Sequence, residues 1–108
     1  MSKAYLTTVA ALLALAAPAA HGQEEGEFGV LKIAAGVETT YFTCAGCHSE
    51  RLVAQQGLSR EDWDELLDWM IEEQGMGAID EADRTEILDY LAEHYNEDRP
   101  NFPGPANN

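Results

Sequence analysis

The stretch CAGCH at positions 44–48 constrains the fold of this chain more than any other feature, because it contains both of the cysteines. The chain has 108 residues. A domain of that size buries little apolar surface, so it commonly relies on disulfides, a metal or a bound cofactor for stability. The fold is therefore expected to form around whatever the two thiols and the adjacent imidazole hold.

The first 22 residues have the three parts of a secretory signal peptide. Lys3 gives a positive start, residues 9–17 (VAALLALAA) are apolar, and small residues flank a cleavage site at 20–22. The apolar run is shorter than the ~20 residues that span a bilayer, so an uncleaved anchor is the less favoured alternative. We expect residues 1–22 to be removed and the mature protein to have no membrane span and to be periplasmic in a Gram-negative host.

Three of the four chemistries that use two cysteines at this spacing fit the chain poorly. A disulfide across so short a loop restricts the unfolded chain very little. A structural zinc site needs four Cys or His ligands, and outside the motif the mature chain offers only His94. A thioredoxin-like dithiol needs a βαβ context, and the sequence has no parallel-sheet pattern.

A covalently attached haem accounts for all three residues of the motif. Two thiols one helical turn apart suit the vinyl groups of the porphyrin, and the adjacent imidazole suits an axial position on the iron. The motif therefore predicts one haem c, tethered through Cys44 and Cys47, with His48 as an axial ligand. A small thiol protein without haem is the alternative.

Hydrophobic periodicity predicts an all-α domain over residues 36–95, with three to four helices around the haem. The first helix, at about 36–47, has Val37, Tyr41 and Cys44 on one face. Residues 49–58 are expected to form a short turn or loop around the prosthetic group. Residues 23–35 are expected to be a loose lead-in, and the Pro-rich tail at 96–108 is expected to be extended or disordered.

Two longer helices are predicted after this loop. The second helix, at about 60–74, begins after Ser59 as N-cap and ends at Gly75 and Gly77. Its inward stripe consists of Trp63, Leu66, Leu67, Met70 and Ile71. The last helix, at about 81–95, begins after Asp80 as N-cap. One face of it carries Ile87, Tyr90, Leu91 and His94.

These features together resemble a small class I c-type cytochrome. Gly36 stands eight positions before Cys44, Tyr41 supplies an aromatic residue, and the last helix contains IxxYL at 87–91. The resemblance implies that the first and last helices cross with a glycine at their contact. It also implies a protein that transfers single electrons between exported redox proteins and is not itself an enzyme.

A closer similarity lies within that class. The order of Trp63, Met70 and Gly75, followed by IDEAD at 79–83 and a Tyr-Leu pair at 90–91, is similar to the cytochrome c subunit of periplasmic sulfite dehydrogenases. That subunit accepts electrons from a molybdenum-containing partner. The similarity implies a dehydrogenase as electron donor and a terminal oxidase or another cytochrome as acceptor.

The second axial ligand is open between two methionines. Met70 lies in the inward stripe, where methionine often only fills core space. Met76 lies between two glycines, in the loop setting that is common among class I cytochromes. The resemblance points to Met70, because its spacing from Trp63 is the one matched, and Met76 is the alternative. Ligation by His94 or an open position remains, and an open position would give a ligand-binding or peroxidase-like haem protein.

Three further residues carry expectations. No proline lies between His48 and Arg99, so a backbone carbonyl near residues 56–59 is expected to fix the axial imidazole in place of the proline carbonyl common in the class. Trp63 is expected to pack against the porphyrin or in the helix core. Trp69 is expected on the polar side of its helix, as a partner contact or a lone surface aromatic.

The charge of the chain bears on its partners. Twenty acidic and six basic residues give a formal net charge of −14. Such a surface attracts basic docking faces of redox partners, repels nucleic acid and anionic lipid, and loses its attraction as salt rises. Adaptation to a saline habitat is the other explanation of this acidity.

Overall fold

The computed structural model describes residues 26–100 and 102, and this part of the chain contains four helices. They are α1 (Val37–Cys44), α2 (Arg51–Ala54), α3 (Arg60–Glu73) and α4 (Glu81–His94). Among these residues the only β-pairing is an isolated bridge between Gly26 and Gly29. The all-α prediction is confirmed for the part of the chain that the structure describes. None of its helices is long and apolar enough to span a bilayer.

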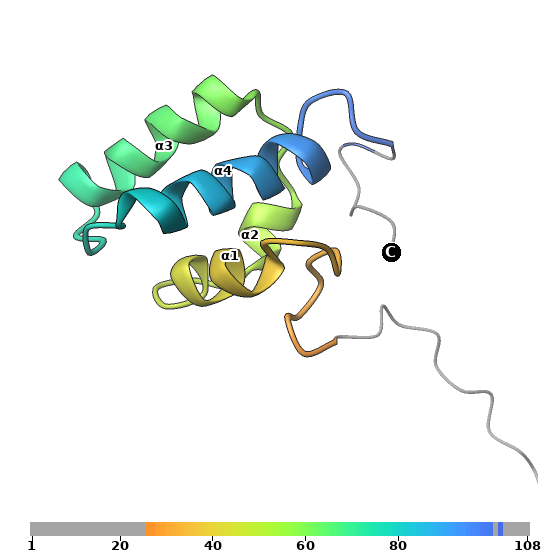
Figure 1. Ribbon diagram of the computed structural model, residues 1–108, viewed down its shortest axis with the longest axis horizontal. Helices are drawn as coiled ribbons and strands as arrows, with labels where there is room; N and C mark the ends of the chain where they lie inside the picture. Colours follow the sequence, from red (N-terminus) through yellow and green to blue (C-terminus); the bar gives the residue numbers. More distant parts are fainter. Residues whose placement is uncertain (1–25, 101, 103–108) are drawn as a thin grey trace, which may run out of the picture.

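The arrangement of the helices centres on α4. Figure 1 shows α3 along one side of α4 and α1 on its other side, with the short α2 between α1 and α3 along the chain. Ile87 and Leu91 of α4 are almost fully buried, as are Trp63 and Leu67 of α3. The inward faces expected from the 3.6-residue period are therefore the faces that form the core.

Both long helices begin at the predicted caps. The Ser59 Oγ accepts a hydrogen bond from Asp62 N at 3.1 Å, and the Asp80 Oδ1 accepts one from Asp83 N at 2.9 Å. Gly75 follows the end of α3 with φ 71°, a left-handed conformation that favours glycine. Residues 49–58, predicted as a short turn or loop, contain the helical turn α2.

A glycine lies at the contact of α1 with α4, as the resemblance implied. Gly36 precedes α1 with φ 91°. A Cβ at this position would lie 2.9 Å from the Tyr90 Cβ and 3.1 Å from the Glu86 carbonyl oxygen. Any larger residue would therefore have to push the two helices apart.

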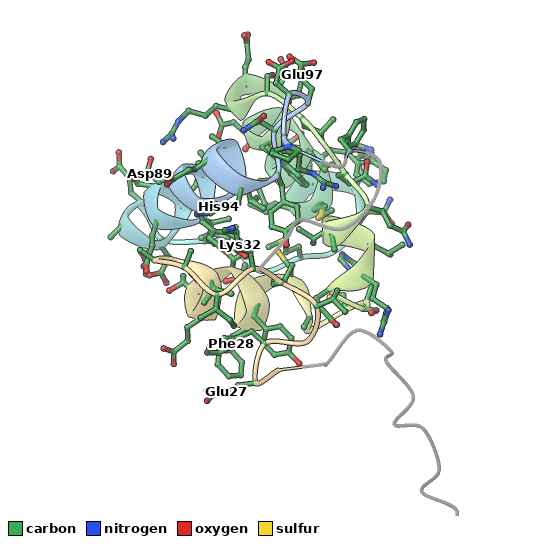
Figure 2. All side chains as sticks on the ribbon, turned by 90° about the vertical axis from the view of Figure 1, so that its right-hand side faces the viewer. Glu27, Phe28, Lys32, Asp89, His94 and Glu97 are labelled. Atoms are coloured by element: carbon green, nitrogen blue, oxygen red, sulfur yellow. The ribbon has the colours of Figure 1, made fainter. Side chains whose placement is uncertain are left out.

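Residues 26–35 are anchored in the core through Val30 and Leu31, so their interpretation as a loose lead-in is wrong at these positions. Leu31 is fully buried, although the segment contains no helix. The Tyr90 hydroxyl donates to the Lys32 carbonyl oxygen at 2.7 Å, and the Lys32 N–H donates to the Tyr95 hydroxyl at 3.0 Å. Figure 2 shows Lys32 close to His94 of α4. Two buried tyrosines thus hold this segment through its backbone.

The described part of the tail, residues 96–100 and 102, also packs on the domain. Arg99 is only 5% exposed, and its guanidinium donates to the carbonyl oxygens of Ala54 (3.0 Å) and Gln56 (3.2 Å). The same group lies over the rings of Tyr95 and Phe102. The expectation of an extended or disordered tail is wrong for these residues. The remaining tail and the predicted signal peptide at 1–22 lie outside the described residues.

Candidate functional site

A cavity of about 660 Å³ opens between the end of α1, the helix α2, one face of α3 and the turn after α3. Its lining consists of Thr43, Cys44, Cys47, His48, Leu52, Val53, Gln56, Leu58, Trp63, Leu66, Trp69, Met70, Gln74 and Met76. All five predicted site residues are among them: both cysteines, His48 and both methionines. No Asp, Glu, Lys or Arg lines this cavity, so its wall offers no carboxylate for acid–base chemistry.

The two thiols lie at the α1 end of the cavity in different environments. Cys44 is the last residue of α1 and is buried, whereas Cys47 is exposed, and neither forms a disulfide. Burial raises the pKa of the Cys44 thiol to about 11. A reactive dithiol needs a thiol that readily loses its proton, which burial opposes. The Cys44 thiol is therefore a poor nucleophile in this structure, which disfavours dithiol redox chemistry through it.

The His48 ring is held by its own neighbour. Its Nδ1 lies 3.0 Å from the Ser49 carbonyl oxygen. Because a carbonyl oxygen can only accept, Nδ1 carries the proton, and the lone pair of Nε2 is free to bind a metal. The carbonyl oxygen that bonds this nitrogen is therefore that of Ser49, and not one near residues 56–59 as expected.

The two methionines reach the cavity together. Met70 lies on α3, and its carbonyl oxygen accepts hydrogen bonds from both Gln74 N (3.2 Å) and Met76 N (3.1 Å). These bonds turn the chain back on the end of α3, with Gly75 in the left-handed conformation. Met76 is consequently returned to the same wall as Met70. Both side chains are partly buried, and the structure places both thioethers at one cavity.

The tryptophan wall of the cavity is anchored on the C-terminal end of α4. The Trp63 Nε1 donates to the Tyr95 carbonyl oxygen at 3.0 Å, in a buried position. The same oxygen accepts from Leu58 N at 3.0 Å. Trp63 and Leu58 both line the cavity, so one carbonyl fixes two parts of its wall. Trp63 therefore belongs to the core and to the cavity lining at once, so its expected core position is confirmed, while its contact with a porphyrin stays a prediction.

Several lining residues were missed by sequence reasoning. The sequence predicts only a short turn or loop around the prosthetic group at residues 49–58. It does not predict which side chains of this segment line the cavity, namely Leu52, Val53, Gln56 and Leu58. Trp69 had been placed on the polar side of α3, and it is 49% exposed, yet it also lines the cavity. Its position next to Met70 on the helix was a usable signal, because adjacent helical residues lie only 100° apart.

His94 lies elsewhere. It is absent from the cavity lining, and its ring packs against Tyr90 with centroids 5.2 Å apart. Figure 2 shows it on α4 beside Lys32. Within residues 26–100 and 102 no cluster of three or more His, Cys, Asp or Glu side chains could hold a metal ion. Any metal bound at the cavity would therefore depend on the imidazole and the thioethers.

The cavity fits a haem by its size and by its donor atoms. Its volume falls within the ~300–1,000 Å³ range typical of small-molecule and cofactor sites, and its lining is mainly apolar. An imidazole nitrogen and a thioether sulfur are the axial donors of c-type cytochromes.

No protein-family model, curated protein or solved structure matches the chain. Support for a haem at this cavity therefore comes from the residues that line it.

Proposed function

We propose that the chain is a monohaem c-type cytochrome that transfers single electrons between exported redox proteins. The observation that carries the proposal is that one mainly apolar cavity is lined by both thiols of the CxxCH motif, its histidine and both methionines of the mature chain. The cavity thus has two thiols that could attach a haem, and an imidazole and thioethers that could bind its iron.

Each residue has a role that follows from its position. Cys44 and Cys47 would tether the cofactor at the end of α1, and His48 would offer its Nε2 to the iron because its Nδ1 is bonded to the Ser49 carbonyl oxygen. Met70 is the favoured second ligand on the basis of the resemblance, with Met76 the alternative. The apolar wall excludes water from the iron. A bound haem would supply a one-electron redox centre, and thioether ligation favours its reduced state.

The proposal includes a place in an electron-transfer chain. The similarity to the electron-accepting subunit of sulfite dehydrogenases supports a molybdenum-containing dehydrogenase as donor. Export by the signal peptide, cleaved after residue 22, places the protein in the periplasm. The net charge of −14 supports donor and acceptor proteins with basic docking faces.

The first experiment tests haem attachment. The full chain is expressed in a strain that matures c-type cytochromes, and its intact mass and absorption spectrum are measured. The expected mass is that of the polypeptide without residues 1–22 plus one haem, with the sharp reduced-state bands of low-spin iron. A colourless protein with the mass of the bare polypeptide would refute the proposal.

The second experiment identifies the sixth ligand. Met70→Ala is expected to abolish the weak red charge-transfer band of sulfur on ferric iron, and to allow carbon monoxide to bind the reduced protein. Met76→Ala is expected to keep the band. His94→Gln, away from the cavity, is the control that should change neither readout. Loss of the band only in Met76→Ala would assign the ligand to Met76, and free binding of carbon monoxide by the unaltered protein would favour the open-position alternative.

A further inference from the structure

The exposed face of α3 carries a tryptophan surrounded by carboxylates. Trp69 is 49% exposed, and Glu65, Glu72 and Glu73 lie four residues before it and three and four residues after it. Residues at these spacings are neighbours on a helix surface. All three glutamates are exposed. The four residues therefore form one ridge, which we call the Trp69 ridge.

The carboxylates of this ridge differ from the two acidic side chains of α3 that lie against α4. Asp64 and Asp68 both form ion pairs with Arg84 of α4, at 2.7 and 2.8 Å. Glu65, Glu72 and Glu73 make no ion pair with any residue that the structure describes. Asp64 and Asp68 thus share one arginine of α4 at the surface, whereas the three ridge glutamates have no cationic partner among the described residues and lie exposed to solvent.

Trp69, the one ridge residue that lines the candidate haem cavity, connects the ridge to the cavity rim. Trp69 lies among the lining residues together with Leu66 and Met70 of the same helix. Leu52 of α2, another lining residue, is 50% exposed. Trp69 and Leu52 are therefore apolar side chains that line the cavity and are also exposed to solvent. A protein seated on the ridge would therefore contact the cavity rim.

We propose that the Trp69 ridge is the docking surface for a redox partner that presents an arginine- or lysine-rich face. This inference rests on the proposed function and adds to it the place where the partner binds. A guanidinium or ammonium group stacks favourably on an indole ring, and tryptophan is the best aromatic residue for this contact. Three carboxylates within one helical turn of the ring complement further cations on the same face. An apolar centre with a charged rim is the usual anatomy of a transient interface.

The first test maps where a cationic surface binds. A hexa-arginine peptide is titrated into the ¹⁵N-labelled, reduced full-length protein at low salt. The chain has two tryptophans, and the Trp63 Nε1–H is buried in a bond to Tyr95. The Trp69 indole signal is expected to shift and the Trp63 signal to stay, which provides a control within the same molecule. Equal shifts over the whole acidic surface, with none specific to Trp69, would overturn the proposal.

The second test compares two variants with the same change of charge. E65Q/E72Q/E73Q removes the three ridge carboxylates. E27Q/E97Q/D98N removes three exposed carboxylates elsewhere, and Figure 2 shows Glu27 and Glu97 at opposite ends of the molecule. We expect the ridge variant to bind the peptide at least about fivefold more weakly, and the control variant to change affinity by less than about twofold. Equal losses in the two variants would mean that only net charge matters, and would refute a specific surface.

The third test measures electron transfer and separates this proposal from the previous one. A basic cytochrome c serves as the probe in stopped-flow oxidation of the reduced protein. The ridge variant is expected to slow the second-order rate about tenfold at low salt, while its own haem spectrum stays unchanged. An unchanged rate with haem attached would refute the ridge and leave the electron-transfer function intact. Peptide shifts at Trp69 in a protein without haem would refute the electron-transfer function and leave the ridge as a surface that binds cations. Dimerisation of the free protein through this face, seen by ultracentrifugation, would also overturn the proposal.

Discussion

The close contact of α1 with α4 makes a quantitative prediction for Gly36→Ala. The substitution forces a residue with a side chain into φ 91°, which costs about 1–2 kcal/mol. It also places a Cβ 2.9 Å from the Tyr90 Cβ and 3.1 Å from the Glu86 carbonyl oxygen. The backbone oxygen cannot move without shifting α4, so the crowding costs about 1–3 kcal/mol more. Alanine also lowers the conformational entropy of the unfolded chain, which offsets about 0.4–1 kcal/mol of this cost. The free energy of unfolding should therefore fall by about 2–4 kcal/mol.

Two other glycines separate the contributions to this loss. Gly75 also has a positive φ of 71°, but a Cβ there would meet no atom within 4 Å. Gly75→Ala should therefore lose only the conformational part, about 0.5–1 kcal/mol after the same correction. Gly77 has neither a positive φ nor a close neighbour, so Gly77→Ala should stay within about 0.5 kcal/mol of the unaltered protein.

The assay is urea unfolding of the exported protein, followed by far-ultraviolet circular dichroism. The denaturation midpoint should fall in the order Gly77→Ala, Gly75→Ala, Gly36→Ala, with the slope m unchanged in all three. A stability of about 5–15 kcal/mol, typical of native domains, leaves even the last variant folded. A Gly36→Ala variant as stable as Gly75→Ala would show that the two helices do not approach as closely as described.

Three further predictions follow from the contacts of single side chains. Arg99→Met removes hydrogen bonds to two carbonyls at the end of α2, and should lower the free energy of unfolding by about 2–3 kcal/mol, measured by urea titration. Ser59→Ala and Asp80→Ala each remove an N-cap bond and should each cost about 1 kcal/mol, with a smaller effect for glycine at the same position. In reduced protein prepared without haem, burial raises the Cys44 pKa from 9.0 to about 11, so the folded state holds the proton more tightly than the unfolded one. The contribution of the Cys44 thiol to the free energy of unfolding is then fully present below pH 9 and is lost as the pH rises toward 11. Thermal melts across that range would detect this loss. A flat profile would contradict the burial of this thiol.

Local sequence patterns were sufficient for the parts of the fold that depend on neighbours along the chain. The N-caps at Ser59 and Asp80 involve backbone groups three residues away, and the buried faces of α3 and α4 follow the 3.6-residue period. The CxxCH motif likewise defines its own chemistry within five residues. These features were predictable because the interactions that produce them span a single helical turn.

The contacts between distant segments were decided by the tertiary structure alone. Leu31 and Arg99 lie in segments without periodicity, and both are buried because Tyr90, Tyr95 and the carbonyls at the end of α2 bond to these segments across the fold. No pattern along the chain records such partners, since they come from elements 40 or more residues apart in sequence.

The candidate site shows the same division. The sequence by itself determined which residues are candidates to hold a haem, namely the two thiols, His48 and the two methionines, because the chemistry of a side chain is local. Only the tertiary structure brought all five to one cavity, and it did so through the turn in which the Met70 carbonyl binds Met76 N and through the packing of Trp63 on Tyr95. It also placed Trp69 at the rim, because the position of a cavity depends on how the helices pack and not on any one of them.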